Sequence, residues 1–321
     1  ESLLRRTIKR TLINLYGDYT ILPGLTYRAS FNGDIENRLI DSYSPIGIIN
    51  TADINDNSGS AGKTNQDFLN LLHESIISYS KQINASHSLK FTGVFASQVE
   101  NYRSNQISAT GFPNDATKNE ALQLALNRTV SSSRSKQRLD SYMGRINYGF
   151  KDKIFLDLTA RIDGSSKFGA NNKYGFFPAA SAAWRLVEES FIRDINQISD
   201  LKLRASYGIT GNAGGISPYN SLATVESSGG YNINHGWQTA ISPTGIANPD
   251  LRWERSKQAN IGLDLGLFNN KLSFVFDYYH KETDDLLYVK TLPLSSGYAT
   301  IVGNFAALQN NDPDRGPGPD D

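Results

Sequence analysis

The chain has 321 residues, a formal net charge of zero and no cysteine. The charge balance argues against nucleic acid as the main partner, because phosphate binding requires a basic excess. Without cysteine, disulfide frameworks, thiolate metal sites and cysteine nucleophiles are excluded. Hydrophobic residues make up only 39% of the chain, whereas 16 Tyr, 15 Phe and 27 Gly are present. This composition favours β-structure with an aromatic girdle over a helical core.

Hydropathy alone does not decide between a soluble protein and a membrane protein. No apolar run approaches the ~20 residues that a membrane helix needs, and the mean hydropathy is -0.41. A transmembrane β-barrel also shows such a value, because only alternate residues of its strands face lipid. The pattern of residues along the chain therefore has to distinguish the two classes.

Apolar and polar residues alternate with a period of two along most of the chain, which indicates β-strands. We predict about ten strands, each close to the ~9–11 residues that span a bilayer when tilted. In chain order the segments are 6–15, 22–35, 66–83, 88–103, 137–150, 153–163, 174–187, 201–210, 259–267 and 271–281.

The polar residues of these strands share one face. In the segment 153–163, for example, Leu156 and Leu158 flank Asp157. We expect this face to line the lumen of a barrel, where charges stay hydrated or pair with whatever fills the pore. A solvated face of a soluble sheet is the alternative for each residue. The predicted lumen-facing residues are Asp157, Arg161, Asp163, Arg204 and Asp264, together with Lys202 and Asp277.

The connections between the predicted strands differ in length in a regular way. Short connections are expected at 16–21, 84–87, 151–153 and 268–270, with a link at 188–200 that could form one helical turn. Longer polar segments fall at 37–65, 104–136 and 211–255, with a shorter one at 164–173. Short turns then gather at one rim and long loops at the other. This asymmetry is typical of outer-membrane barrels.

Four aromatic residues of the predicted loops are candidates to contact a substrate or a protein lid. They could stack on sugar rings or pack on a partner, and ordinary loop packing is the alternative. These residues are Tyr102, Tyr219, Tyr231 and Trp237. No spacing indicates an enzyme, because there is no GxSxG elbow and the four histidines are too far apart for a HExxH-type zinc site. We therefore expect no catalytic residue, metal or cofactor.

Several segments resemble the SusC-type TonB-dependent transporters of the bacterial outer membrane. The matching motifs are DYTILPGL (18–25), FGA (168–170), KYGFFPAASAAWRL (173–186), LKLRASYGITGN (201–212) and NPDLRWE (248–254). The resemblance implies a barrel of about 22 strands that is closed by an internal plug. It also implies import of glycans, peptides or other oligomeric nutrients, a SusD-like lipoprotein as lid, and energy from the TonB complex.

The resemblance covers only part of such a transporter. The plug, the N-terminal part through which TonB would act, and the final strands are absent from the sequence. We therefore expect a fragment, with a partial outer-membrane β-barrel over residues 1–309. The Pro/Gly/Asp-rich residues 310–321 are expected to form a disordered tail. Within this interpretation, the loops 104–136 and 211–255 are expected to touch the substrate or the lid.

Two alternatives remain open from the sequence. A soluble or secreted β-sheet protein could bind glycans through Tyr231 and Trp237, but it leaves the one-sided loop lengths unexplained. A hydrolase of the outer membrane would need a nucleophile or a carboxylate pair near a histidine at one rim, and no such spacing is evident.

Overall fold

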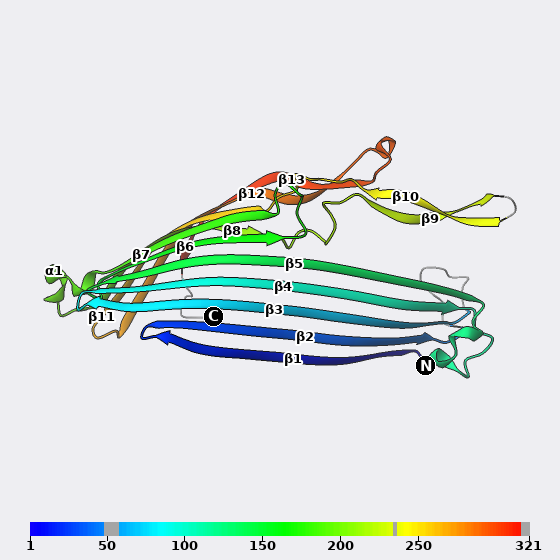
Figure 1. Ribbon diagram of the computed structural model, residues 1–321, viewed down its shortest axis with the longest axis horizontal. Coiled ribbons are helices and arrows are strands. Elements are labelled where there is room, and N and C mark those ends of the chain that lie inside the picture. The colour runs from blue at the N-terminus through cyan, green and yellow to red at the C-terminus, as the bar shows by residue number, and fades with distance from the viewer. Residues whose placement is uncertain (48–57, 234–235, 316–321) are drawn as a thin grey trace. The chain divides into compact units, whose positions relative to one another are not determined.

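The structure, a computed structural model, describes residues 1–47, 58–233 and 236–315. Within these residues the chain is almost entirely β-structure (Figure 1). Eleven strands form one sheet in the order β1-β2-β3-β4-β5-β6-β7-β8-β11-β12-β13, and β9 and β10 form a separate two-stranded sheet. From β5 to β13, neighbouring strands pair antiparallel. The predicted all-β antiparallel class is confirmed.

The elements have the following bounds. The strands of the first half are β1 Leu3–Leu22, β2 Leu25–Ser44, β3 Ser60–Asn84, β4 His87–Thr110 and β5 Asn127–Phe150. Those of the second half are β6 Ile154–Ser165, β7 Tyr174–Arg185, β8 Ile198–Asn212, β9 Thr224–Ile233, β10 Gly236–Gly245, β11 Glu254–Leu267, β12 Leu272–Thr291 and β13 Thr300–Arg315. The helix α1 covers Ser190–Arg193, and short 3-10 turns cover Lys118–Glu120, Leu122–Leu124, Leu186–Glu188 and Leu294–Ser296. None of the helices in the described residues is long and apolar enough to cross a membrane.

The chain forms two compact units. Unit 1 comprises Glu1–Tyr16, Ser30–His73 and Gln98–Arg138, and unit 2 comprises Gly17–Ala29, Glu74–Ser97 and Leu139–Asp321. The boundary falls inside each of the strands β1 to β5, so one part of each of these strands belongs to unit 1 and the other part to unit 2.

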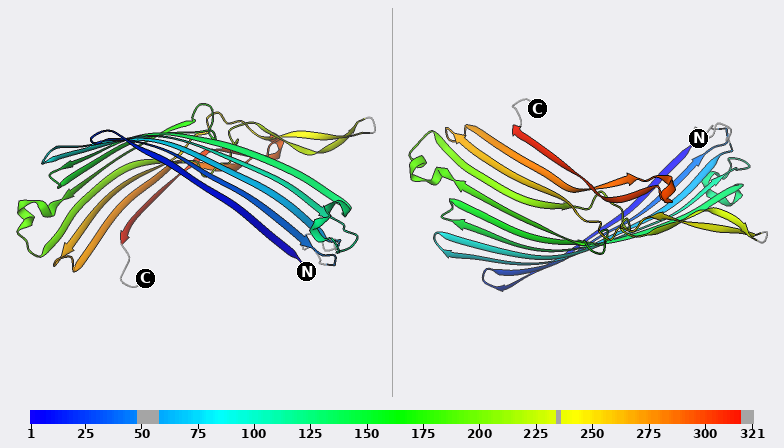
Figure 2. Two further views of the ribbon diagram at one scale, coloured as in Figure 1. Left: turned by 60° about the horizontal axis from the view of Figure 1, so that its bottom comes forward. Right: turned by 90° about the horizontal axis from the view of Figure 1, so that it is seen from above.

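Unit 2 shows the predicted alternation in three dimensions. Figure 2 shows its strands β6, β7, β8, β11 and β12 side by side in a curved sheet. On one face, Leu158 lies opposite Ile146 on β5 and Ala180 on β7, and Ala180 lies opposite Tyr207 on β8. Leu158 is 55% exposed and its apolar neighbours along this face are also exposed. A broad apolar face open to the surroundings suits contact with lipid.

The strands of the first half are much longer than predicted. β3 has 25 residues and β5 has 24, whereas about 10 span a bilayer. In unit 1, residues 127–138 of β5 are polar on both faces except for Val130. The predicted loop 104–136 was therefore too long, and the observed loop is 111–126. The error has a physical reason: the backbone ladder of a sheet continues without apolar side chains, so loss of alternation does not end a strand.

The other connections follow the predicted asymmetry with three corrections. The predicted loop 211–255 contains the strands β9 and β10. The first turn does not lie at 16–21, because β1 continues to Leu22 and turns at Pro23 and Gly24. Gly24 has a φ of +86°, and a side chain there would overlap the carbonyl of Ser80. The predicted loop 37–65 narrows to 45–59, of which 48–57 lie outside the described residues. The turns near 84–87, 151–153 and 268–270 and the helical turn in 188–200 are confirmed.

The last strand, β13, extends beyond residue 309, where the barrel domain was expected to end. β13 pairs with β12 from Thr300, opposite Thr291, to Arg315, opposite Phe276. Within this ladder Pro313 lies opposite Tyr278. The remaining residues of the expected tail, 316–321, lie outside the described residues.

Candidate functional site

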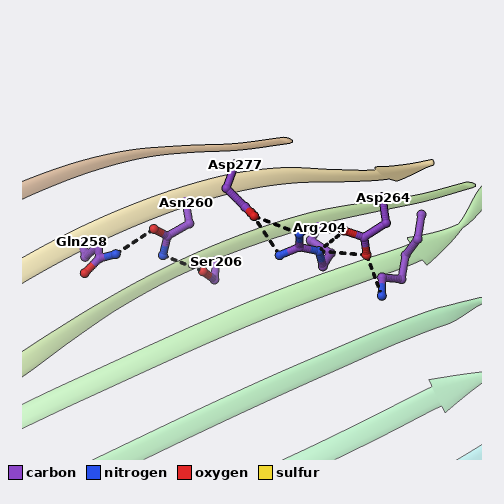
Figure 3. Close-up of polar contacts among 7 residues, drawn as sticks. Arg204, Ser206, Gln258, Asn260, Asp264 and Asp277 are labelled. Carbon is purple, nitrogen blue, oxygen red and sulfur yellow. Dashed lines mark hydrogen bonds and ion pairs between the residues drawn. The ribbon is translucent and has the colours of Figure 1, made fainter. Parts of the chain in front are cut away.

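An ion-pair network joins three strands on the polar face of unit 2 (Figure 3). Arg204 on β8 donates from Nη2 to Asp264 Oδ1 on β11 at 2.7 Å and from Nε to the same carboxylate at 3.1 Å. Its Nη1 also lies 3.1 Å from Asp277 Oδ1 on β12. Lys202 Nζ lies 2.7 Å from Asp264 Oδ2. The predicted residues Arg204 and Asp264 are thus brought together.

A glycine makes this network possible. Gly262 on β11 lies opposite Arg204 on one side and Asp277 on the other. A Cβ at Gly262 would overlap Asp277 Oδ1 and lie 2.8 Å from Arg204 Cζ. The guanidinium therefore crosses the β11 backbone where a side chain would block it. Because these groups are partly exposed, each pair contributes on the order of 1 kcal/mol or less, and the main effect is to orient the charges.

A row of polar side chains crosses the same face next to the ion pairs. Asn147, Asp157, Ser181, Ser206 and Asn260 lie opposite one another on β5, β6, β7, β8 and β11. Asn147 donates to Asp157, and Asn260 Nδ2 donates to Ser206 Oγ at 3.1 Å (Figure 3). A hollow of about 270 Å³ lies over this row. It offers donors and acceptors to a hydrated solute.

The other predicted polar residues form a separate pair on β6. Arg161 Nε lies 2.7 Å from Asp163 Oδ2, and Arg161 Nη2 donates to Ser141 Oγ on β5 at 3.0 Å. Asp157, Arg161 and Asp163 share one face because they are separated by even numbers of residues. All seven predicted polar residues therefore lie on the polar face of unit 2, in three groups. That these residues line the lumen and contact what fills it stays a prediction.

The four predicted aromatic residues do not form one platform. Tyr102 lies in β4 and not in a loop. Tyr219 lies between β8 and β9 with a φ of 73°. Tyr231 on β9 lies opposite Gln238, whereas Trp237 on β10 lies opposite Asn232. Adjacent ladder positions point to opposite faces, so Tyr231 and Trp237 lie on opposite faces of the β9–β10 hairpin.

Sequence reasoning missed a buried cluster that we call the loop core of unit 2. The Phe168 and Trp253 ring centroids are 4.5 Å apart, and Phe177 meets Trp253 edge-on at 5.4 Å. Trp253 Nε1 donates to the Lys173 carbonyl at 3.1 Å, which satisfies the buried indole. The members of the cluster are Phe168, Phe177, Ile216, Leu251 and Trp253.

The FGA and NPDLRWE motifs meet in this cluster. Gly169 N donates to the Leu251 carbonyl at 2.9 Å, and a Cβ at Gly169 would overlap the Pro249 carbonyl. Lys167 Nζ donates to the carbonyls of Ala213 and Ile216 at 3.2 and 3.0 Å. The motifs therefore hold together both ends of the connection 213–253. The signal that could have revealed this is the aromatic and glycine content of both motifs.

The end of the connection is also tied to the last two strands. Arg252 Nη2 lies 2.6 Å from Asp285 Oδ1 on β12, and this hydrogen bond raises the pKa of Arg252. Asn304 on β13 accepts from Arg252 N at 3.0 Å and donates to the Arg252 carbonyl at 2.9 Å. Asn248 Nδ2 donates to the Val302 carbonyl at 3.0 Å. The base of the β9–β10 hairpin is thus anchored, while among the described residues β9 and β10 pair with each other and with no other strand (Figure 1).

A second cluster, which we call the loop core of unit 1, holds the loop 111–126. Asp115 accepts hydrogen bonds from the Tyr43 hydroxyl and from Ile46 N, the latter at 3.0 Å. The hydrogen bond from Tyr43 lowers the pKa of Asp115 most, and the bond from Ile46 N lowers it further. The members of the cluster are Tyr43, Ala61, Ala109, Phe112 and Ala125.

A sheet with one exposed apolar face, one polar face and long loops at one end of its strands defines the wall of an outer-membrane β-barrel. Residues 5–315 match the family described as TonB dependent receptor-like, β-barrel, and the chain belongs to this family. TonB-dependent receptors are proteins of the outer membrane, so this localisation holds for the chain.

The relatives are consistent with the SusC-type resemblance. TonB-dependent receptor P3 of Formosa agariphila is 35% identical over 97% of this chain and 30% of its own length. TonB-dependent receptor SusC of Bacteroides thetaiotaomicron is 30% identical over 91% of this chain and 28% of its own length. The solved RagAB peptide transporter is similar with a TM-score of 0.83 and 27% identity, over 97% of this chain and 34% of the transporter chain. The chain thus spans less than a third of the length of the curated relatives.

Proposed function

We propose that this chain forms part of the wall of a transporter that imports glycans or peptides across the outer membrane. The observation that carries the proposal is the two-sided sheet of unit 2. Its apolar face, with Leu158, Ile261 and Phe276 more than half exposed, suits lipid. Its polar face carries oriented charges and a hollow, which suit a hydrated passage.

The proposal includes two partners. Like the family, the transporter takes its energy from the TonB complex, through a part of the receptor other than these strands. A SusD-like lipoprotein covers the long-loop end. The β9–β10 hairpin is the surface that we assign to this lid, because Trp237 is 71% exposed and Ile241 is equally open. Large exposed apolar residues on an anchored ribbon suit a protein contact.

The alternatives derived from the sequence are weaker. A soluble glycan-binding protein would expose the apolar face of unit 2 to water, where such a patch aggregates. It would also need Tyr231 and Trp237 on one face, and their register separates them. The hydrolase alternative is weakened by family membership, because the family is one of receptors and transporters. The carboxylates Asp163, Asp264 and Asp277 of the polar face are engaged in ion pairs.

Uptake by intact cells tests the proposal. Labelled oligosaccharides and labelled peptides are offered to cells with and without the gene for this protein, in the presence and absence of TonB. We expect uptake of one of the two classes to require both the protein and TonB. Uptake that is unchanged when the protein is removed would contradict the import function. Uptake that needs the protein but not TonB would contradict the energy source alone.

A further inference from the structure

Two aromatic rings lie in contact on one face of unit 1. Phe68 on β3 and Tyr102 on β4 have ring centroids 4.7 Å apart, with an angle of 42° between the planes. Phe68 is 36% exposed and Tyr102 is half-buried. The pair is therefore fixed by its own contact and still offers part of its surface. Rings in a packed apolar core would not be exposed in this way.

A cation and a carboxylate border the rings. The Arg38 guanidinium on β2 lies over the Phe68 ring, with Cζ 5.4 Å from the centroid. Glu36 Oε1 accepts from Arg38 Nη2 at 2.6 Å, which fixes the guanidinium in place. The cation–π contact and the ion pair together position a hydrogen-bond donor and an acceptor at the edge of the aromatic surface.

Amide groups continue the face on the next positions of the strands. Gln98 Nε2 on β4 donates to Asn70 Oδ1 on β3 and to Glu100 Oε1, both at 3.0 Å. Gln137 on β5 donates to Glu100. Along β5, Gln137 is an even number of residues from Asn147, so both point to the polar side of that strand. The rings thus interrupt an otherwise hydrophilic surface.

We propose that Phe68 and Tyr102 form a stacking subsite for the ring of a neutral saccharide. A pyranose has an apolar C–H face that suits an exposed aromatic surface, and a rim of hydroxyls that both donate and accept. Arg38 and the amides supply donors, whereas Glu36 and Glu100 supply acceptors. Two carboxylates against one guanidinium disfavour acidic sugars, because like charges repel at short range. This subsite deepens the proposed import function and rests on it.

The test uses the protein as the cell makes it, purified from outer membranes in detergent. Binding of maltohexaose, xylohexaose and mannohexaose is measured by titration calorimetry, with an uncharged hexapeptide as the competing ligand class. For the oligosaccharide that binds, we expect Phe68→Ala and Tyr102→Ala each to weaken binding about tenfold. Phe68→Tyr keeps the ring and should stay within about twofold. Phe31→Ala is the matched control, because Phe31 lies on β2 in the same unit with a similar exposure of 43%.

Each outcome decides the proposal. Loss of oligosaccharide binding in both ring variants, with Phe31→Ala unchanged, supports the subsite. Unchanged binding in the ring variants overturns it, as does the absence of binding by any of the three oligosaccharides. Loss of hexapeptide binding instead would overturn the saccharide assignment. The uptake experiment above is independent: oligosaccharide binding without any protein-dependent uptake would reject import and leave the subsite standing.

Discussion

The two units of this chain show that strand length and lipid contact are separate properties. β5 belongs to both, with residues 127–138 in unit 1 and 139–150 in unit 2. In unit 2 its exposed apolar residues Tyr142 and Ile146 are four positions apart and lie on one face. In unit 1 both faces of the strand are polar except at Val130. The ladder of hydrogen bonds continues through both parts, because backbone groups pair whatever the side chains are.

The loop cores of the two units also differ in apolar content, with the larger apolar side chains in unit 2. The loop core of unit 2 contains three aromatic rings, whereas that of unit 1 contains three alanines beside Tyr43 and Phe112. Buried apolar area largely determines how firmly a loop is held. The connection 213–253 is therefore expected to be held more firmly at its base than the loop 111–126.

Truncation of one aromatic side chain in each loop core should have the largest effect on stability. It should also show whether the two loop cores are independent. We expect Phe168→Ala to cost about 3–5 kcal/mol, because it removes a buried ring whose neighbours cannot fully collapse. Limited proteolysis should then cut the connection 213–253 faster and leave the loop 111–126 unchanged. Phe112→Ala should give the reverse pattern. If either variant exposed both segments equally, the two cores would not be independent.

A charge on the outward face should distinguish the units by their surroundings. Leu158→Arg is expected to cost about 2–4 kcal/mol of folding free energy in a bilayer, because the charge would enter lipid. Val130→Arg is the matched variant, since Val130 is 74% exposed and lies on the same face of β5 as Ile146. We expect it to be neutral. Reversible unfolding in phospholipid vesicles measures both, and equal costs would place residues 127–138 in lipid as well.

Substitution of Gly169 by Ala tests how tightly the loop core of unit 2 is packed, and the same substitution at Gly144 is the control. Gly169→Ala should cost about 1–3 kcal/mol, because its Cβ would overlap the Pro249 carbonyl. Gly144→Ala has no atom within 4 Å of its Cβ and should be close to neutral. Thermal unfolding of the two variants provides the comparison. A neutral Gly169→Ala would mean that the 246–253 segment does not lie against residue 169.

Lowering the pH should slightly destabilise the loop 111–126 of unit 1. The folded-state pKa of Asp115 is lowered, so its contribution to stability is present above the unfolded value of about 3.9. This contribution is lost as the pH falls through the lower folded value. The rate of proteolysis within 111–126 should therefore rise at low pH in the natural protein. In Asp115→Asn the rise should be smaller, and identical pH profiles would contradict the role of Asp115.

The alternation of side chains predicted the class, the strands β6, β7, β8, β11 and β12 of unit 2, and the polar face. It did not predict β9, β10 and β13. Arg204 and Asp264 could be placed on one face from their positions alone, but not their contact. That contact depends on the register of β8 against β11 and on Gly262 between the two flanking strands. Register is a property of the paired strands, and it is weakly specified by the residues of one strand.

The loop residues were predicted less well. Tyr102, next to the end of the predicted strand 88–103, was treated as a loop residue, yet β4 continues to Thr110 and Tyr102 lies against Phe68. Tyr231 and Trp237 were treated as one surface, and the register of a single hairpin separated them. The motifs around Phe168 and Trp253 revealed the family. Their physical role, a buried core between distant loops, could not be read from either motif alone.

What the sequence by itself determined is the two-sidedness of the strands, since a period of two is a local property that each residue fixes with its neighbours. It also determined the family, because the motifs are contiguous. Only the tertiary structure decided where strands end, which charges meet, and which aromatic rings lie together. These depend on contacts between residues such as Phe68 and Tyr102, or Gly169 and Leu251, which are far apart in the chain and are brought together by the pairing of strands and the packing of loops.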